Sequence, residues 1–193
     1  MLGLKLTTDP RWANLAEKSL QEVLTDHAYC EQKAALNCIS LIAHYPERER
    51  LVEELAPIVT EEWGHFRQVL RELKQRNLKL GHKRKDDYVN ELLKLERKNV
   101  NHDEKLVERL LIAAMIEARS CERFRILSLH LDSEEMRQFY HSFMVSEAGH
   151  YRLFIDLAKE YGNEEQVKER WNELLVAEGE IMERMVPRGD RVH

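Results

Sequence analysis

The sequence predicts an all-α fold whose core is a bundle of four long helices. Helix-forming residues dominate, and the 193 residues include only seven glycines and four prolines, a balance that favours helices over sheets. Apolar residues recur at alternating spacings of three and four along four long segments, which is the pattern of a helix with one buried face. Each of these four stripes is interrupted near its middle by one glutamate.

The helix boundaries follow from local signals. Asp9-Pro10 favours a helix start, and a helix-period pattern then runs to Ala43, with a candidate break near Thr25-Asp26 and a stop at Pro46. The next helix is expected over 47–75, with a kink at Pro57. The remaining segments are expected in this order: a loop at 76–86, a polar helix at 87–98, long helices at 102–130, 134–161 and 164–185, and an irregular tail at 187–193. These extra segments surround the bundle in one domain, residues 1–193.

Composition excludes several classes of protein. With 43% hydrophobic and 34% charged residues the chain reads as globular. It lacks an apolar run of the roughly 20 residues that span a bilayer, and no signal peptide is recognisable. Three cysteines do not make a disulfide framework, so we expect a cytoplasmic protein that does not enter a membrane. The net charge of −5 argues against a protein that coats nucleic acid.

The glutamates that interrupt the stripes form a repeated pattern. They are Glu31, Glu62, Glu117 and Glu147. The second and fourth are each followed three residues later by a histidine on the same helix face, His65 and His150. Glu31 precedes Glu62 by 31 positions, and Glu117 precedes Glu147 by 30. The pattern therefore predicts two similar helix pairs, each contributing half of one site.

Four carboxylates in one core require compensation, because burying an unpaired charge costs several kcal/mol. Two divalent cations would cancel four carboxylate charges, and two neutral imidazoles would complete the coordination. One glutamate from each of two helices plus Glu-x-x-His from each of the other two is the di-iron pattern of ferritin-like bundles. We therefore expect two iron ions, with manganese as the alternative, and no catalytic residue beyond the ligands. Glu62 and Glu147 are expected to bridge the ions because each is paired with a histidine.

The segments around these residues resemble a known family. They are 26–35 (DHAYCEQKAA), 61–66 (EEWGHF), 116–124 (IEARSCERF) and 147–151 (EAGHY). Together they resemble the MiaE family of tRNA hydroxylases, over nearly the whole chain. The resemblance implies a non-haem di-iron monooxygenase that uses O2 and an external electron donor, an electron-transfer protein or reductase. Its substrate would be the isopentenyl group of (2-methylthio-)N6-isopentenyladenosine in the tRNA anticodon loop, and all six ligands carry over.

Other side chains have two readings each. His27, one turn before Glu31, is either a partner of that ligand or an ordinary core histidine. Cys121, one turn after Glu117, either lines the site or fills the core as a small hydrophobe. Arg119 and Arg123 either contact RNA or pair with acids such as Glu122.

One basic stretch is a candidate RNA contact. Between Lys74 and Lys85 there are six cations and no acid, and we expect Lys79, Lys83, Arg84 and Lys85 to contact phosphates. Two alternative functions use the same sequence features. A ferroxidase or iron-storage protein would use the same metal site, whereas a helical interaction module would hold no metal.

Overall fold

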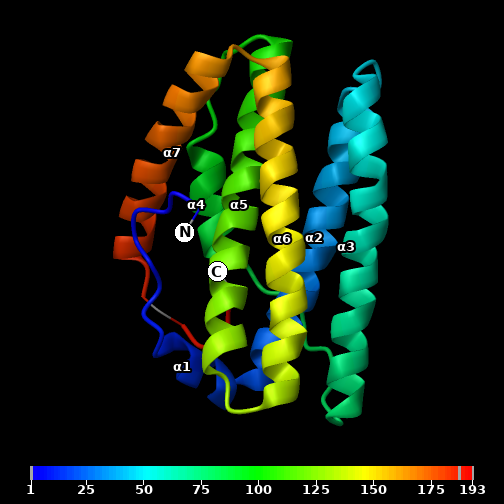
Figure 1. Ribbon diagram of the computed structural model, residues 1–193, viewed down its shortest axis with the longest axis vertical. Helices are drawn as coiled ribbons and strands as arrows, with labels where there is room; N and C mark the ends of the chain where they lie inside the picture. The colour runs from blue at the N-terminus through cyan, green and yellow to red at the C-terminus, as the bar shows by residue number, and fades with distance from the viewer. Residues whose placement is uncertain (1, 187, 193) are drawn as a thin grey trace. The chain divides into compact units, whose positions relative to one another are not determined.

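The computed structural model describes residues 2–186 and 188–192, and within them it contains seven helices and no strand. The helices follow one another along the chain (Figure 1) as α1 (Trp12–Lys18), α2 (Leu20–His44), α3 (Glu49–Gln75), α4 (Asp87–Lys94), α5 (His102–His130), α6 (Glu134–Tyr161) and α7 (Glu164–Arg184). The predicted all-α class is confirmed. None of these helices has the length and hydropathy needed to cross a membrane.

The chain divides into two compact units. One comprises residues 15–85 and 188–192, and the other comprises residues 1–14 and 86–187, apart from the undescribed residues. The boundary between them falls inside α1. The expectation of one domain over 1–193 stays a prediction, and its residues 1, 187 and 193 lie outside the described part of the chain, as do the two ends of the predicted tail.

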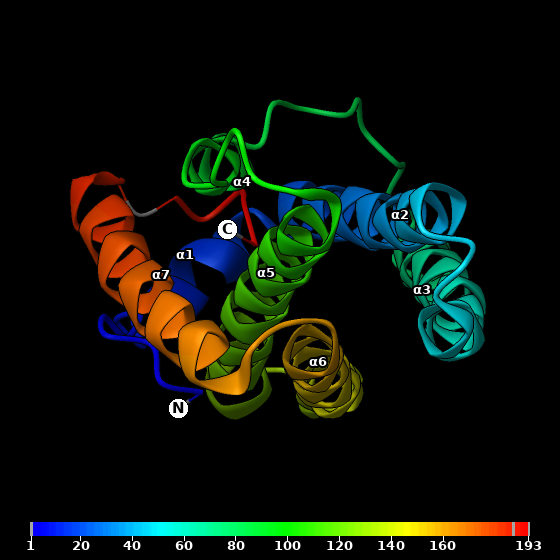
Figure 2. The same ribbon diagram turned by 90° about the horizontal axis from the view of Figure 1, so that it is seen from above.

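The α2–α3 unit is a hairpin of two helices that lie side by side (Figure 2) and run in opposite directions (Figure 1). Fully buried leucines and valines, such as Leu24 and Leu41 on α2 and Leu51 and Val69 on α3, lie on the apolar stripes of the two helices. This is the arrangement that the spacings of three and four predict. Pro57 does not end α3, which continues through it.

The second unit is built on α5. This helix packs along α6, and α4 and α7 lie against it as well. Two buried ion pairs join α5 to α7: Glu108 to Arg170, and Arg119 to Glu178. In these two pairs the later residue on α5 contacts the later residue on α7. The two helices therefore run in the same direction (Figure 1).

Capping residues fix the starts of α5, α6 and α7. Asn101 and Glu104 form a reciprocal capping box at the start of α5, and Ser133 and Asn163 cap α6 and α7 with their side chains. These starts agree with the predicted ones.

The candidate break near Thr25-Asp26 was wrong, because α2 is continuous from Leu20 and the chain instead breaks at Ser19. The Thr25 and Asp26 side chains form hydrogen bonds with other segments of the chain. They accept hydrogen bonds from Gly81 N and Val192 N, which lie far along the chain.

Candidate metal centre

Three candidate ligands converge within the α2–α3 unit. Glu31 lies in the middle of α2, and Glu62 and His65 lie one turn apart on α3. One donor atom of each lies within 4.8 Å of the other two. His65 Nδ1 is 3.2 Å from Glu31 Oε2 and 3.6 Å from Glu62 Oε2. Donor atoms that each bind one ion at about 2.0–2.2 Å lie a few ångströms from one another, as these three atoms do. The three side chains are therefore spaced to bind one divalent cation.

His27 supports the first of these ligands. Its side chain is fully buried, and its Nε2 lies 2.7 Å from Glu31 Oε1. Because an ionised carboxylate only accepts hydrogen bonds, the N–H at Nε2 donates. This contact orients one Glu31 oxygen and leaves Oε2 directed toward His65, which is how partners behind metal ligands usually act.

The α5–α6 pair places an equivalent set in the other unit. Glu117, Glu147 and His150 are 6%, 3% and 3% exposed, and one donor atom of each lies within 4.8 Å of the others. His150 Nδ1 lies 3.7 Å from Glu147 Oε2. Each unit therefore brings together one glutamate and one Glu-x-x-His pair, and we call these two sets the α2–α3 half-site and the α5–α6 half-site.

Two neighbours of the histidines escaped the sequence reading. Glu61 Oε1 lies 3.8 Å from His65 Nε2, and Ser146 Oγ lies 3.5 Å from His150 Nε2. Each precedes its histidine by four residues, so the helical spacing could have identified both.

The buried thiols are poor ligands in their present surroundings. Burial, with a further contribution from Glu62, raises the pKa of Cys38 to about 12. Burial and the nearby Glu147 raise the pKa of Cys121 to about 11. With these pKa values both cysteines remain protonated near neutral pH. Metals and electrophiles react with the thiolate, which is therefore scarce. Cys121 is fully buried and its Sγ donates to Met144 O, which fits the core reading of this residue.

Arg119 lies inside the protein. Its side chain is fully buried, donates twice to Glu178 and once each to Glu122 and Leu6 O, and the Tyr88 hydroxyl also donates to Glu178. Burial opposes its charge, but the nearby carboxylates outweigh that effect and raise its pKa. The pairing with acids that the sequence offered as one reading is thus present.

Arg123 is also buried. Its guanidinium stacks over the Trp12 ring at 4.3 Å, and burial lowers its pKa to about 10. In this structure neither Arg119 nor Arg123 presents its charge to solvent, and their expected RNA contacts have no support from the geometry.

The cations of the basic loop, residues 76–86 between α3 and α4, differ in their exposure. Lys79, Lys83 and Lys85 are exposed, whereas Arg84 is partly buried and pairs with Glu22 and Asp190. Three of the four residues expected to contact phosphates therefore lie at the surface.

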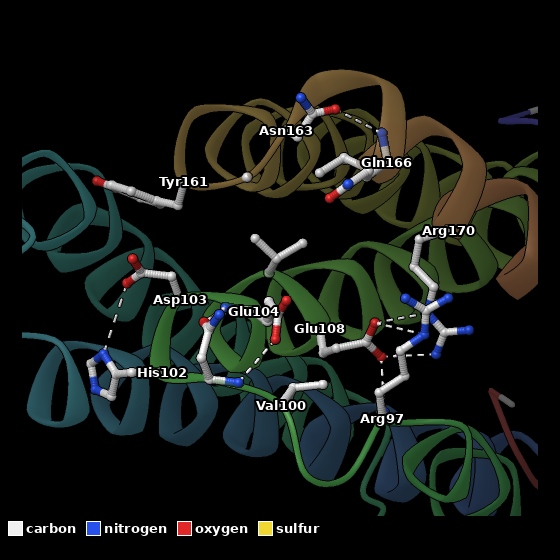
Figure 3. Close-up of a pocket in the computed structure, with 14 residues that line it drawn as sticks. Arg97, Val100, His102, Asp103, Glu104, Glu108, Tyr161, Asn163, Gln166 and Arg170 are labelled. Carbon is white, nitrogen blue, oxygen red and sulfur yellow. Dashed lines mark hydrogen bonds and ion pairs between the residues drawn. The ribbon is translucent and has the colours of Figure 1, made fainter.

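A cavity of about 480 Å³ lies elsewhere in the second unit, between the starts of α5 and α7 (Figure 3). None of the six candidate ligands lines it. Its buried carboxylate, Glu108, accepts from Arg170 through both oxygens and from Arg97 N. Asn101 and Asn163 use their side chains to cap the two helices. These polar groups of the cavity are thus engaged within the protein.

Comparisons with known proteins identify the family. Residues 2–193 match the family described as tRNA-(MS[2]IO[6]A)-hydroxylase (MiaE). The chain is 38% identical, over 91% of its length and 84% of the relative, to the tRNA 2-(methylsulfanyl)-N(6)-isopentenyladenosine(37) hydroxylase of Pseudomonas putida KT2440. It is 27% identical to the enzyme of the same name from Salmonella typhimurium LT2, over 77% and 71% of the two chains.

A solved structure shares the fold. It is named as protein 43 with aldehyde deformylating oxygenase activity from Synechococcus, and the match has a TM-score of 0.91 at 33% identity over 98% of this chain and 94% of the other. This neighbour confirms the ferritin-like class. Together with the family match over nearly the whole length, the duplicated half-sites show that the chain belongs to the MiaE family.

Proposed function

We propose that this protein is an O2-dependent tRNA hydroxylase that acts on the isopentenyl group of (2-methylthio-)N6-isopentenyladenosine in the anticodon loop. One observation carries the proposal: in a member of the MiaE family, each unit buries a glutamate beside a Glu-x-x-His pair whose donor atoms lie within 4.8 Å of one another. The names of the two curated relatives support the substrate. The cytoplasm, where we expect this protein, is consistent with a tRNA substrate.

The donor set suits iron. Each half-site supplies two carboxylates and one imidazole, and such oxygen-rich ligation with histidine fits iron or manganese. We propose that each half-site would hold iron, through Glu31, Glu62 and His65 in one unit and through Glu117, Glu147 and His150 in the other. A bound iron pair would supply the activation of O2 that hydroxylation of an unactivated C–H bond requires. The electrons would come from an external electron-transfer protein or reductase.

The protein side chains have separate tasks at this centre. His27 fixes the orientation of Glu31 through its 2.7 Å contact. Fully buried apolar residues above and below the ligands on the same stripes, among them Phe143 and Phe154 on α6, exclude water from the α5–α6 half-site. A dry site protects reactive chemistry from side reactions with solvent.

Fold alone does not decide among the possible functions. The solved neighbour is named for an aldehyde deformylating oxygenase activity on a similar fold, so the same architecture supports other substrates. The substrate therefore rests on the family and its curated relatives. A ferroxidase for iron storage would need a cage-forming oligomer, which light scattering on the purified protein would detect.

The decisive experiment analyses tRNA nucleosides by mass spectrometry. Cells that carry the gene should contain hydroxylated isopentenyladenosine, cells that lack it should contain only the unhydroxylated form, and the Glu62→Ala variant should fail to restore the product. Equal amounts of hydroxylated nucleoside in cells with and without the protein would overturn the proposal.

A further inference from the structure

The main chain of the basic loop is fastened to α2. Gly81 N donates to Thr25 Oγ1, and Gly81 O accepts from the Tyr29 hydroxyl, both at 3.1 Å. Gln21 Nε2 donates to Lys79 O at 3.0 Å. A Cβ at position 81 would lie 3.2 Å from the Thr25 methyl group, so glycine permits this close approach. On the side of the loop, main-chain atoms make all three of these contacts.

The C-terminal segment is fastened to the same helix. Asp26 accepts from Arg191 Nη1 at 3.1 Å and from Val192 N at 2.9 Å. Arg84 joins the loop to this segment, since its guanidinium donates to Asp190 Oδ2 at 2.8 Å and to Asp190 O at 2.7 Å.

Arg84 also reaches α2 itself. It contacts the Glu22 carboxylate at 2.7 Å and donates to Glu22 O at 3.1 Å. Hydrogen bonds from Arg188, followed by the charges of Arg84 and Arg191, keep the pKa of Asp190 below its usual range, so Asp190 stays ionised within the anchor. Arg84 is thus occupied in holding three segments together.

The resulting surface is basic. Lys79, Lys83 and Lys85 are exposed on the loop, and the Arg188 side chain is 55% exposed on the adjoining segment. We call these four residues the loop–tail surface. Two acids at this segment pair with its own arginines, Asp26 with Arg191 and Asp190 with Arg188. Positive charge therefore gathers here in a chain whose net charge is −5.

We propose that the loop–tail surface is a preorganised platform for the phosphate backbone of the RNA substrate, in which Lys79, Lys83 and Lys85 contact phosphates and Arg84 holds the platform together without touching RNA. This inference rests on the proposed function, which supplies the RNA. Lysines are flexible point charges that suit phosphates rather than a planar, bidentate ligand. Phosphate contacts position a nucleic acid without reading its sequence.

The platform also has a fixed relation to the α2–α3 half-site. Its anchors Gln21, Thr25, Asp26 and Tyr29 lie on α2 within the three turns that precede Glu31. RNA bound to the loop would thereby be held at a fixed position along α2 relative to Glu31, a candidate metal ligand on the same helix.

The first test removes charge from the loop. The triple variant K79Q/K83Q/K85Q should raise the Kd for unmodified tRNA about 10- to 100-fold at 0.15 M salt, and it should flatten the slope of log Kd against log salt by about 2 to 3. The matched control K98Q/K159Q/K168Q changes the same charge at exposed lysines of the other unit and should leave both quantities near wild type. Equal effects of the two triple variants would overturn the inference.

The second test separates an anchor from a contact. R84K keeps the charge but loses the two-pronged contact with Asp190, so both R84K and R84Q should speed amide hydrogen exchange at Gly81 and Val192. K79Q/K83Q should leave that exchange unchanged. If R84K retained wild-type exchange and tRNA affinity while R84Q lost tRNA affinity alone, Arg84 would be a phosphate contact and its assignment here would be wrong.

Binding and turnover must be measured separately. Unchanged tRNA affinity in the loop variant, with hydroxylation intact, would remove the platform and leave the proposed function standing. Absence of hydroxylation by the iron-loaded wild type, with tRNA bound through the loop, would instead remove the function. A loop variant that bound tRNA normally, but was slower with a protein reductase than with a chemical reductant, would assign the surface to an acidic protein and overturn the inference.

Discussion

The α2–α3 half-site and the α5–α6 half-site share their ligand spacing but differ in what lies behind the ligands. Four residues before Glu31 is His27, which holds that carboxylate at 2.7 Å. Four residues before Glu117 is Ala113, which offers no hydrogen bond. The same helical position is polar and engaged in one half and apolar in the other. The two metal ions should therefore be held with different strength.

The histidines differ in the same sense. The His65 side chain is 14% exposed and has the carboxylate of Glu61 near its Nε2, whereas the His150 side chain is 4% exposed and has the hydroxyl of Ser146 there. A carboxylate behind an imidazole makes it a more basic ligand than a hydroxyl does. Duplication of the ligand pattern thus does not produce two equivalent positions.

The helices α2 and α5, which carry Glu31 and Glu117, are supported differently as well. The back of α5 is buried and holds charged partners, above all Arg119 with Glu178. The back of α2 holds the loop and the C-terminal segment through hydrogen bonds from Thr25 and Asp26. The buried charges should matter more for stability, because removing one partner leaves the other uncompensated.

The largest effect is expected where the two half-sites are alike. Purified protein should carry about two iron atoms per chain, and Glu62→Ala or Glu147→Ala should each remove most of that iron, since we expect each to serve both ions. Elemental analysis measures the content. Glu53→Ala, which removes an exposed carboxylate elsewhere on α3, should keep the iron. Full occupancy in either ligand variant would show that its glutamate does not bridge.

The next effect concerns the support of the two helices. Arg119→Met leaves Glu178 buried without its main partner and should lower the free energy of unfolding by about 3–5 kcal/mol. Thr25→Val removes the acceptor for Gly81 N on α2 and should cost about 1 kcal/mol. Urea denaturation measures both.

Two further variants test the reason for that difference. The double variant R119M/E178M should recover much of the loss, because it removes both charges. Arg125→Met, at an exposed position of α5, should stay within about 0.5 kcal/mol of wild type. Equal destabilisation by Arg119→Met and Arg125→Met would mean that the buried network contributes no special support.

The six candidate ligands could be predicted from the sequence because burying a polar residue on an apolar helix stripe costs free energy. Such a position can be recognised from residue spacing alone. It could also predict contacts between residues three or four apart, such as Arg119 with Glu122. It could not predict that Arg119 would meet Glu178, 59 positions away. The predicted break near Thr25-Asp26 was wrong for the same reason, because the partners of these side chains, Gly81 and Val192, are distant in sequence.

The asymmetry between the half-sites can be broken directly. His27→Ala should weaken binding of one of the two ions about tenfold, because partners behind metal ligands contribute that much to affinity. Anaerobic release of iron to a chelator should then show one accelerated phase and one unchanged phase. His44→Ala, at an exposed position on the same helix, serves as the control. Acceleration of both phases together would contradict an effect confined to the α2–α3 half-site.

The smallest effect concerns the thiols, where the halves differ again, since Cys121 follows Glu117 by four residues and Ala35 occupies the matching place after Glu31. Burial raises the pKa of Cys121 to about 11 and that of Cys38 to about 12. At pH 8 a thiol of pKa about 11 is thiolate in only about one molecule in a thousand. Iodoacetamide should therefore modify the partly exposed Cys30 first, and labelling of Cys121 should accelerate as pH rises toward 11. Denatured protein, in which all three thiols titrate normally, should label evenly. Modification of native Cys121 as fast as Cys30 would place a thiolate beside the α5–α6 half-site, and Cys121 would then have to be counted among its reactive groups.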